Sequence, residues 1–344
     1  MKTILLTPLC LATIFAARTE AARPNVLFIL VDDMGWGDLG ANGGAGVPTP
    51  GMDRLAREGT RFTRFYVASP ICSPSRCGFI TGQFPARWRI TSYLQTRAGN
   101  RQCDQADFLD PRAPSFVRAF KDAGYATAHI GKWHLGGGRD VKDAPKFAAY
   151  GYDLGLGTHE SPERAVALGI KTVPWSETTE PQQVKRHDRT RWMVDQTLAF
   201  VRRDTGRPWL INLWLVDFFP TLCALAAVPV PKGVAFDGED MSAAFRGGTR
   251  ARSRALFWEY GRRPPPDGAD APSPFPYPSE PGSRSPNVAV RDGRWKLLVN
   301  ADGSRLELYD MEADPGESKN LAEAEVAVAR RLRESALGWR KSLP

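Results

Sequence analysis

A cysteine and an arginine in one short motif are the residues of this sequence most suited to chemistry. Cys72 opens the run Cys-x-Pro-Ser-Arg that ends at Arg76, and the apolar pair Phe79-Ile80 follows it. A cysteine at a helix start has in principle a lowered thiol pKa, which makes it a better nucleophile. The planar guanidinium of Arg76 suits the oxygens of an anion. A lone cysteine is more often a half-exposed loop residue, so the assignment depends on the length of the whole motif.

Two further polar clusters follow apolar runs that have the character of buried strands. Asp32 and Asp33 end the first run, and adjacent carboxylates are hard oxygen ligands suited to Ca²⁺ or Mg²⁺. Lys132 and His134 come just after another run, at the strand end where α/β folds place ligand groups. Acid pairs after a strand are otherwise often helix N-caps, and a single Lys or His is commonly an ordinary surface residue. His129 lies inside the strand, which favours a structural role.

Strands and helices alternate in the part of the chain that must position these groups. The continuous apolar run Pro24–Val31 is typical of a strand buried on both faces of a parallel sheet. The alternation predicts an α/β fold with a mostly parallel sheet flanked by helices. The expected strands are 24–31, 62–68, 125–130 and 209–216, and the expected helices are 50–59, 115–123 and 187–204.

The pattern changes near residue 250. Residues 262–286 are rich in proline and are expected to form a long loop. Three short strands follow, separated by Asp-Gly pairs that favour hairpin turns, and a final helix is expected over 322–341. The strands are 287–291, 294–300 and 306–310. The sequence therefore predicts a main domain over 22–253 and a small antiparallel α+β subdomain over 254–344.

The first residues and the composition set broader limits. Lys2, the apolar run Ile4–Ala16 and the small-x-small site at residues 19–21 predict a signal peptide over residues 1–21, and therefore export to the periplasm or the extracellular space. No later run approaches the ~20 apolar residues that a stable membrane span needs. The net charge of +8 is spread along the chain without a basic run interleaved with aromatics, which disfavours nucleic-acid binding and suits an anionic substrate. The odd number of cysteines left after loss of Cys10 argues against a disulfide scaffold, although one bridge stays an open alternative.

The motif around Cys72 resembles the signature of the sulfatases, in which a cysteine is converted to formylglycine (3-oxoalanine). Residues 124–134 resemble the second signature of that family, and residues 24–38 resemble its opening segment. The similarity continues through 150–159 and 291–321, so it covers nearly the whole chain. It implies an alkaline-phosphatase-like fold and hydrolysis of sulfate esters of the arylsulfatase kind. Phosphate-ester hydrolysis, found in the related superfamily, is disfavoured by the context of Cys72.

The resemblance also implies a role for each candidate residue. Cys72 would be oxidised by a formylglycine-generating enzyme or its anaerobic counterpart, and the hydrated aldehyde would attack sulfur. Lys132 would bind the sulfate and neutralise its charge, His134 would polarise or deprotonate the nucleophile, and Arg76 would hold it. The metal ligands would be Asp32, Asp33 and residue 72, with Ca²⁺ as the expected ion and Mg²⁺ as an alternative.

The substrate side of the resemblance is less specific. His159 would contact the substrate, which the resemblance implies to be a sulfate ester. A sulfated polysaccharide as that substrate is an analogy with exported members of the family.

One segment of the family pattern is missing. The strand over residues 208–215 runs directly into Asp217-Phe218-Phe219-Pro220, which resembles a helix that other members carry much later, and the chain holds no Asp-Asn-Gly tripeptide. An internal deletion near residues 215–217 would remove two metal ligands, a His and a Lys that assist the leaving group. We therefore keep two hypotheses: an active sulfuric ester hydrolase, and a catalytically impaired or inactive protein of the sulfatase fold.

Overall fold

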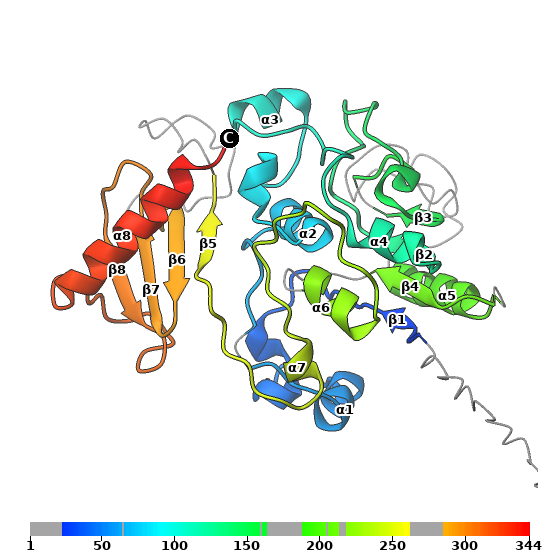
Figure 1. The fold of residues 1–344 in the computed structure, drawn as a ribbon, viewed down its shortest axis with the longest axis horizontal. Helices are drawn as coiled ribbons and strands as arrows, with labels where there is room; N and C mark the ends of the chain where they lie inside the picture. Colours follow the sequence, from blue (N-terminus) through cyan, green and yellow to red (C-terminus); the bar gives the residue numbers. More distant parts are fainter. Residues whose placement is uncertain are drawn as a thin grey trace, which may run out of the picture.

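Two four-stranded sheets, one parallel and one antiparallel, organise the described part of the chain. The structure is a computed structural model that describes residues 23–63, 65–158, 160–163, 188–203, 206–212, 218–261 and 285–344. The parallel sheet lies at the right of Figure 1, and the antiparallel sheet lies at the left with the C-terminal helix. The expected signal peptide and His159 lie outside the described residues.

The parallel sheet has the strand order β1-β4-β2-β3. Every pair of neighbours in it is parallel, so the carboxyl ends of its strands lie at one edge of the sheet. Its strands are β1 (Val26–Leu27), β2 (Ala126–Gly131), β3 (Leu154–Gly157) and β4 (Trp209–Asn212).

Helices cover both faces of this sheet. On one face Ala128 of β2 and Ile211 of β4 pack against Phe200 of α5 (Arg189–Val201). On the other face Leu210 of β4 joins the main core, because successive strand residues point to opposite faces. The helices that contribute to this core are α2 (Cys72–Thr81), α4 (Phe116–Asp122) and α6 (Phe218–Leu225). A sheet covered in this way holds the polar residues at its carboxyl edge in fixed positions.

Local sequence signals explain where several helices begin and end. Pro50 occupies the first turn of α1 (Pro50–Glu58), where its missing N–H costs nothing. The hydroxyl of Ser115 caps α4 by accepting a hydrogen bond from the Arg118 N–H. α2 ends at Gly82, which has a left-handed φ of 65° and lies so close to Phe236 that a Cβ would meet the ring at 2.8 Å. The remaining short helices are α3 (Arg97–Gln102), α7 (Ser242–Phe245) and four single 3₁₀ turns at Trp36–Asp38, Gly40–Asn42, Pro85–Trp88 and Phe147–Tyr150.

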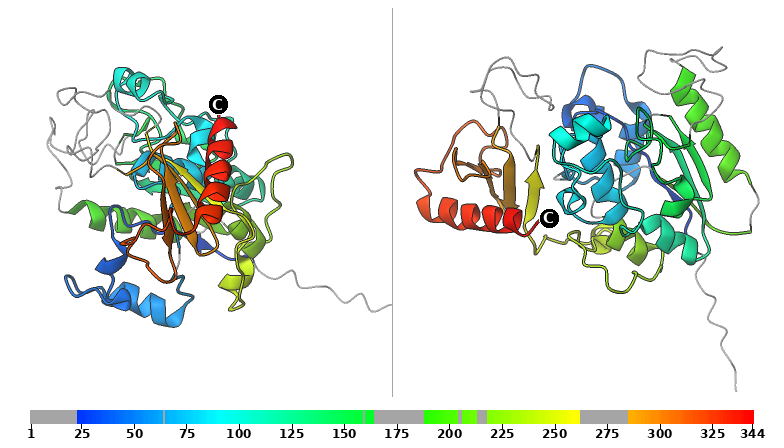
Figure 2. Two further views of the ribbon diagram at one scale, coloured as in Figure 1. Left: turned by 90° about the vertical axis from the view of Figure 1, so that its left-hand side faces the viewer. Right: turned by 90° about the horizontal axis from the view of Figure 1, so that it is seen from above.

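The antiparallel sheet packs one face on the final helix. Its order is β5-β6-β7-β8, and α8 (Val326–Lys341) lies along one face of it (Figures 1 and 2). Val288, Val290 and Leu297 point to that side and are buried with Leu332 of α8. The strands are β5 (Leu256–Glu259), β6 (Val288–Asp292), β7 (Trp295–Val299) and β8 (Glu307–Asp310).

The predicted fold class is confirmed, and two predicted strands are corrected. The run 24–31 forms a two-residue edge strand rather than a strand buried on both faces, and Ile29 is 63 % exposed. β1 lies at the edge of the sheet, so Phe28 and Leu30 pack on the main core, whereas no described helix covers the other side, where Ile29 and Val31 are exposed. The described residues of 62–68 form no strand because no other described strand pairs with them. Two strands were not predicted, β3 and β5, and both are only four residues long.

Candidate active site

Three elements bring Asp32, Cys72, Arg76 and Lys132 close together at the carboxyl edge of the parallel sheet. Asp32 and Asp33 follow β1, and Lys132 directly follows β2, two strands that both flank β4. Cys72 is the first residue of α2, whose remaining residues are all buried. The site therefore joins two strand ends to a helix start.

Arg76 and Lys132 each form an ion pair with a different oxygen of the Asp32 carboxylate. The Nη2 of Arg76 lies 2.9 Å from Oδ1 of Asp32, and the Nζ of Lys132 lies 2.6 Å from Oδ2. The Nη1 of Arg76 also donates to the carbonyl of Lys132 at 2.6 Å. Burial alone raises the pKa of Asp32, but Lys132 and Arg76 outweigh it and hold that pKa below its ordinary value. Asp32 is thus ionised at neutral pH and fixes both cations at one point.

The thiol of Cys72 lies in the field of the same groups. Burial raises the pKa of this thiol and outweighs the opposing effects of Lys132 and Arg76. The helix-start argument for a lowered thiol pKa therefore does not hold here, because desolvation is the larger effect. Cys72 is a neutral thiol at neutral pH, which suits a residue that awaits modification better than one that attacks as a thiolate.

His134 is buried beside the segment that packs on α2. Its Nε2 donates to the carbonyl of Leu94 at 3.0 Å, since a carbonyl can only accept. The N–H of Leu94 in turn donates to the hydroxyl of Ser73 at 3.0 Å, one residue after Cys72. In the neutral ring this fixes the proton on Nε2 and makes Nδ1 the basic nitrogen. Any proton transfer by His134 would therefore pass through Nδ1.

His129 has the structural role expected for it. Its ring stacks on Phe147 at a centroid distance of 5.0 Å and meets Trp133 edge-on at 5.2 Å. Complete burial lowers its pKa to about 3, so the ring is neutral in the folded protein. It fills the core beneath the site rather than taking part in it.

The described residues do not form a complete site for a divalent cation. No group of three or more His, Cys, Asp or Glu side chains within the described ranges is placed to hold a metal ion. Both oxygens of Asp32 are already engaged by Arg76 and Lys132. Calcium needs six to eight oxygen ligands, so Asp32, Asp33 and residue 72 fall short of a shell. Their assignment as metal ligands stays a prediction.

Two residues near Cys72 support the site without having been predicted. The hydroxyl of Ser73 ties Leu94, and through it His134, to the start of α2. The hydroxyl of Ser75 donates to the carbonyl of Ser69 at 2.6 Å and fixes the chain as it enters the helix. The sequence motif contains both serines, but only the fold shows which backbone groups they reach.

Comparisons with known proteins agree with this architecture. A sequence profile described as "Sulfatase" matches residues 24–225. The chain is 40 % identical to mouse (Mus musculus) steryl-sulfatase over 160 residues, which are 44 % of this chain and 24 % of that protein. The chain thus spans about a quarter of the length of the curated relatives that it matches first.

Solved structures share the fold at low sequence identity. A Bacteroides thetaiotaomicron protein studied for the metabolism of multiple glycosaminoglycans superposes with a TM-score of 0.70 at 17 % identity, covering 93 % of this chain and 100 % of that chain. The structure of Ps i-CgsB in complex with k-i-k-neocarrahexaose gives a TM-score of 0.61 at 19 % identity, covering 92 % of both chains.

The fold and the site together define an α/β protein of the alkaline-phosphatase-like class, with a cysteine at a helix start facing two cations. The chain belongs to the sulfatase family, since the family profile covers more than half of it.

Proposed function

We propose that this protein hydrolyses sulfate esters, with residue 72 as the nucleophile after enzymatic conversion of Cys72 to formylglycine. Formylglycine would supply a hydrated aldehyde whose oxygen attacks sulfur, so that one displacement is divided into two easier steps. The observation that carries the proposal is the position of Cys72 at the start of α2, in the field of Arg76 and Lys132.

The two cations suit recognition of a sulfate group. Lys132 is 14 % exposed and can turn its ammonium from Asp32 to a sulfate oxygen, as a compact charge on a flexible stem can. Arg76 is 3 % exposed and stays fixed by Asp32 and the Lys132 carbonyl. We assign Lys132 to sulfate binding and charge neutralisation, and Arg76 to holding residue 72 in position.

We assign His134 as the general base that deprotonates the nucleophile at residue 72. Its Nε2 is committed to the Leu94 carbonyl, so Nδ1 is the nitrogen that takes a proton from the nucleophile. The hydrogen bonds of Leu94 to His134 and to Ser73 fix the position of the imidazole ring relative to the start of α2. If a divalent cation binds at this edge, Asp32 and Asp33 would be the carboxylates that help to hold it, and the ion would polarise a sulfate oxygen.

Substrate and location extend the proposal. A structural neighbour was solved with a neocarrahexaose, and another with D-glucosamine-2-N,6-O-disulfate as its substrate. We propose a sulfated polysaccharide as the substrate of this chain, reached after export through the signal peptide of residues 1–21. Among the described residues no helix has the length and apolar character of a membrane span.

The proposal is tested by producing the chain together with a formylglycine-generating enzyme. Mass spectrometry of the peptide that contains Cys72 should show replacement of the CH₂–SH group by an aldehyde. Hydrolysis of 4-nitrophenyl sulfate should then appear in the modified protein and be absent from Cys72→Ala. Modified protein without any turnover would overturn the proposal and favour the impaired hypothesis. Unmodified cysteine in the presence of the maturation enzyme would refute the assignment of the nucleophile.

A further inference from the structure

Two adjoining pockets lie where the segment before Cys72 meets the antiparallel sheet. The first has a volume of about 510 Å³ and the second of about 610 Å³. Both are lined by Tyr66 and Arg291. The guanidinium of Arg291 lies 4.4 Å from the centre of the Tyr66 ring and donates to its hydroxyl, so this pair forms the wall between them. We call the two pockets together the seam groove.

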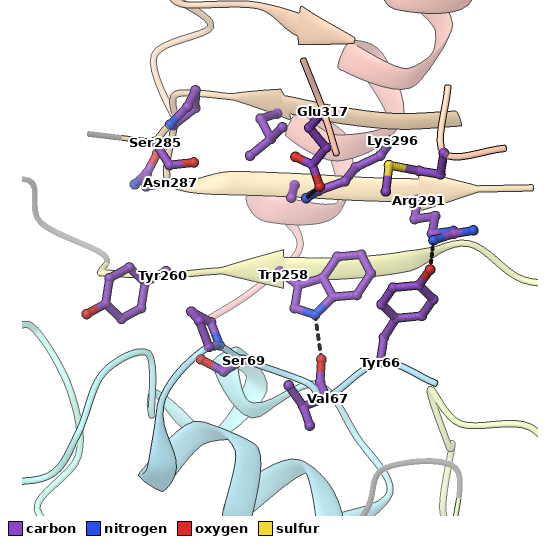
Figure 3. Close-up of a pocket in the computed structure, with 15 residues that line it drawn as sticks. Tyr66, Val67, Ser69, Trp258, Tyr260, Ser285, Asn287, Arg291, Lys296 and Glu317 are labelled. Carbon is purple, nitrogen blue, oxygen red and sulfur yellow. Dashed lines mark hydrogen bonds and ion pairs between the residues drawn. The ribbon is translucent and has the colours of Figure 1, made fainter. Parts of the chain in front are cut away.

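The first pocket is apolar and aromatic, and it uses the sheet face that α8 leaves uncovered. Val288 and Val290 of β6 point to α8, so Ala289 and Arg291 point to the pocket. Trp258 of β5 stands in the middle of this face, with its Nε1 donating to the Val67 carbonyl at 2.8 Å (Figure 3). Its position there presents an aromatic surface to the pocket.

Polar groups at the margin of the first pocket suit hydroxyl groups. Lys296 and Glu317 form an ion pair on the pocket wall, and Tyr260 lines it near Trp258 (Figure 3). An aromatic face beside a carboxylate and an ammonium can stack on a sugar ring and hydrogen-bond its hydroxyls. A volume near 500 Å³ is in the range of small-molecule sites.

The second pocket is strongly cationic. Its lining holds six arginines but only two carboxylates, and one of these, Asp292, is engaged by Arg331 from α8. Arg61 and Arg254 donate to the backbone carbonyls of Ala41 and Phe236, which are neutral acceptors, and neither arginine is within ion-pair distance of a carboxylate among the described residues. The lining arginines are Arg61, Arg250, Arg252, Arg254, Arg291 and Arg294. Of these, Arg294 is paired with Asp310, and Arg252 lies 4.0 Å from Glu239, outside the lining.

We propose that the seam groove binds a sulfated polysaccharide, with a sugar ring against Trp258 and sulfate groups against the arginines of the second pocket. A guanidinium group can donate two parallel hydrogen bonds to two oxygens of one sulfate group, and an aromatic face can stack on a sugar ring. A chain of alternating sugar rings and sulfates matches both pockets at once. The choice of sulfate among anions rests on the proposed function, whereas the preference for a flexible polyanion rests on the groove itself.

The lining of the first pocket comes within two residues of the predicted nucleophile in the sequence. Pro70 lines the first pocket and stands two residues before Cys72, a separation of at most about 7 Å in extended chain. A polysaccharide held in the groove would thus lie close to the segment that carries residue 72. The groove would bind rings next to the reacting one and raise the local concentration of substrate.

Binding to dextran sulfate of defined length tests the proposal, with unsulfated dextran and a single-stranded oligodeoxynucleotide as comparison probes. The protein is produced without the maturation enzyme, so Cys72 stays a thiol and no hydrolysis intervenes. We expect dextran sulfate to bind with an affinity that falls as salt rises, and dextran not to bind measurably. Arg61→Glu/Arg250→Glu should weaken the binding of dextran sulfate at least tenfold.

The matched control is Arg112→Glu/Arg330→Glu, which makes the same change in net charge outside the groove. Arg112 is 88 % exposed with Asp110 as its partner, and Arg330 lies on the exposed side of α8. This control should bind within about twofold of the parent, because screening limits the reach of distant surface charges. Equal losses in the two double variants would overturn the proposal in favour of a general charge effect.

Two variants of Trp258 test whether the aromatic surface of the first pocket takes part in binding. Trp258→Phe keeps a ring, whereas Trp258→Ala removes it, and both lose the hydrogen bond to Val67. Weaker binding of dextran sulfate by the alanine variant alone, with melting temperatures matched, supports stacking. Binding of the oligodeoxynucleotide as tight as that of dextran sulfate would replace the polysaccharide with nucleic acid. These assays are independent of turnover, so a failure of sulfate-ester hydrolysis and a failure of the groove are distinguishable.

Discussion

Replacing Arg76 by methionine tests directly whether the hydrogen bonds of Arg76 stabilise the folded site. The guanidinium makes two short hydrogen bonds, 2.9 Å to Asp32 Oδ1 and 2.6 Å to the Lys132 carbonyl. The side chain is 3 % exposed, so water cannot replace these bonds without opening the core around α2. Methionine fills a similar volume but leaves Asp32 with Lys132 as its remaining cation.

The expected loss of stability can be worked from these contacts. Each hydrogen bond to a charged group contributes about 1.5–3 kcal/mol. Asp32 is 33 % exposed and keeps Lys132, so it can partly rehydrate, and the lower end of the range applies. We expect Arg76→Met to lower the free energy of unfolding by about 3 kcal/mol. For a chain of this size that corresponds to a melting temperature lower by about 4 °C.

Denaturant and thermal unfolding of purified protein, made without the maturation enzyme, measure this loss. Arg112→Met is the matched control, because Arg112 forms a similar ion pair with Asp110 but is 88 % exposed. Its effect on the free energy of unfolding should be too small to resolve, as is usual for exposed pairs. Arg76→Lys should fall between the parent and Arg76→Met, because an ammonium cannot reach both acceptors. A stability of Arg76→Met within about 0.5 kcal/mol of the parent would refute the reasoning, because it would mean that Arg76 does not hold the site together.

Three further outcomes follow from the geometry. Lys132→Ala in the modified protein should lower kcat/KM for 4-nitrophenyl sulfate about 10²-fold, because one positive group facing the developing charge is lost. Calorimetric titration with Ca²⁺ should give a Kd weaker than about 10⁻⁴ M, because the described carboxylates are too few for a shell. Asp153→Asn should lower the melting temperature at neutral pH but have little effect well below pH 4. Burial raises the pKa of Asp153, yet Lys121 and the Thr127 N–H outweigh it and lower the pKa, so its stabilisation exists above the ordinary value of 3.8 and is lost as the pH falls through the folded pKa.

Each outcome has a control or a result that contradicts it. For Lys132, the exposed Lys142→Ala should leave kcat/KM unchanged, and an unchanged value in Lys132→Ala would remove it from sulfate binding. For the metal, tight stoichiometric Ca²⁺ would mean that ligands beyond the described residues complete the site. For Asp153, the control Thr197→Val on α5 should change the melting temperature by the same amount at all pH values. A change in the melting temperature of Asp153→Asn that does not depend on pH would mean that the ion pair of Asp153 with Lys121 does not stabilise the fold.

Most helices and the C-terminal strands could be predicted because their signals are local. Asp-Gly turns, alternating apolar residues and capping residues act within a few positions of where they lie in the sequence. β3 and β5 were not predicted. Both are four residues long, and the two glycines of β3 weaken its strand pattern further. The run 62–68 has strand-forming residues, but a strand also needs a neighbour to bond with, and the sequence does not say whether one is present.

The sequence alone determined the family-like motifs, the α/β alternation and the identity of the residues that meet at the site. Only the tertiary structure decided how those residues interact. The thiol pKa of Cys72 was expected to be low from its place at a helix start and is raised, because burial depends on everything packed around the helix. The ion pairs of Asp32 join residues 44 and 100 positions apart, and the seam groove joins Tyr66 to Arg291 across 225. Local sequence can specify an element and its chemistry, but electrostatics and cavities arise where distant elements meet.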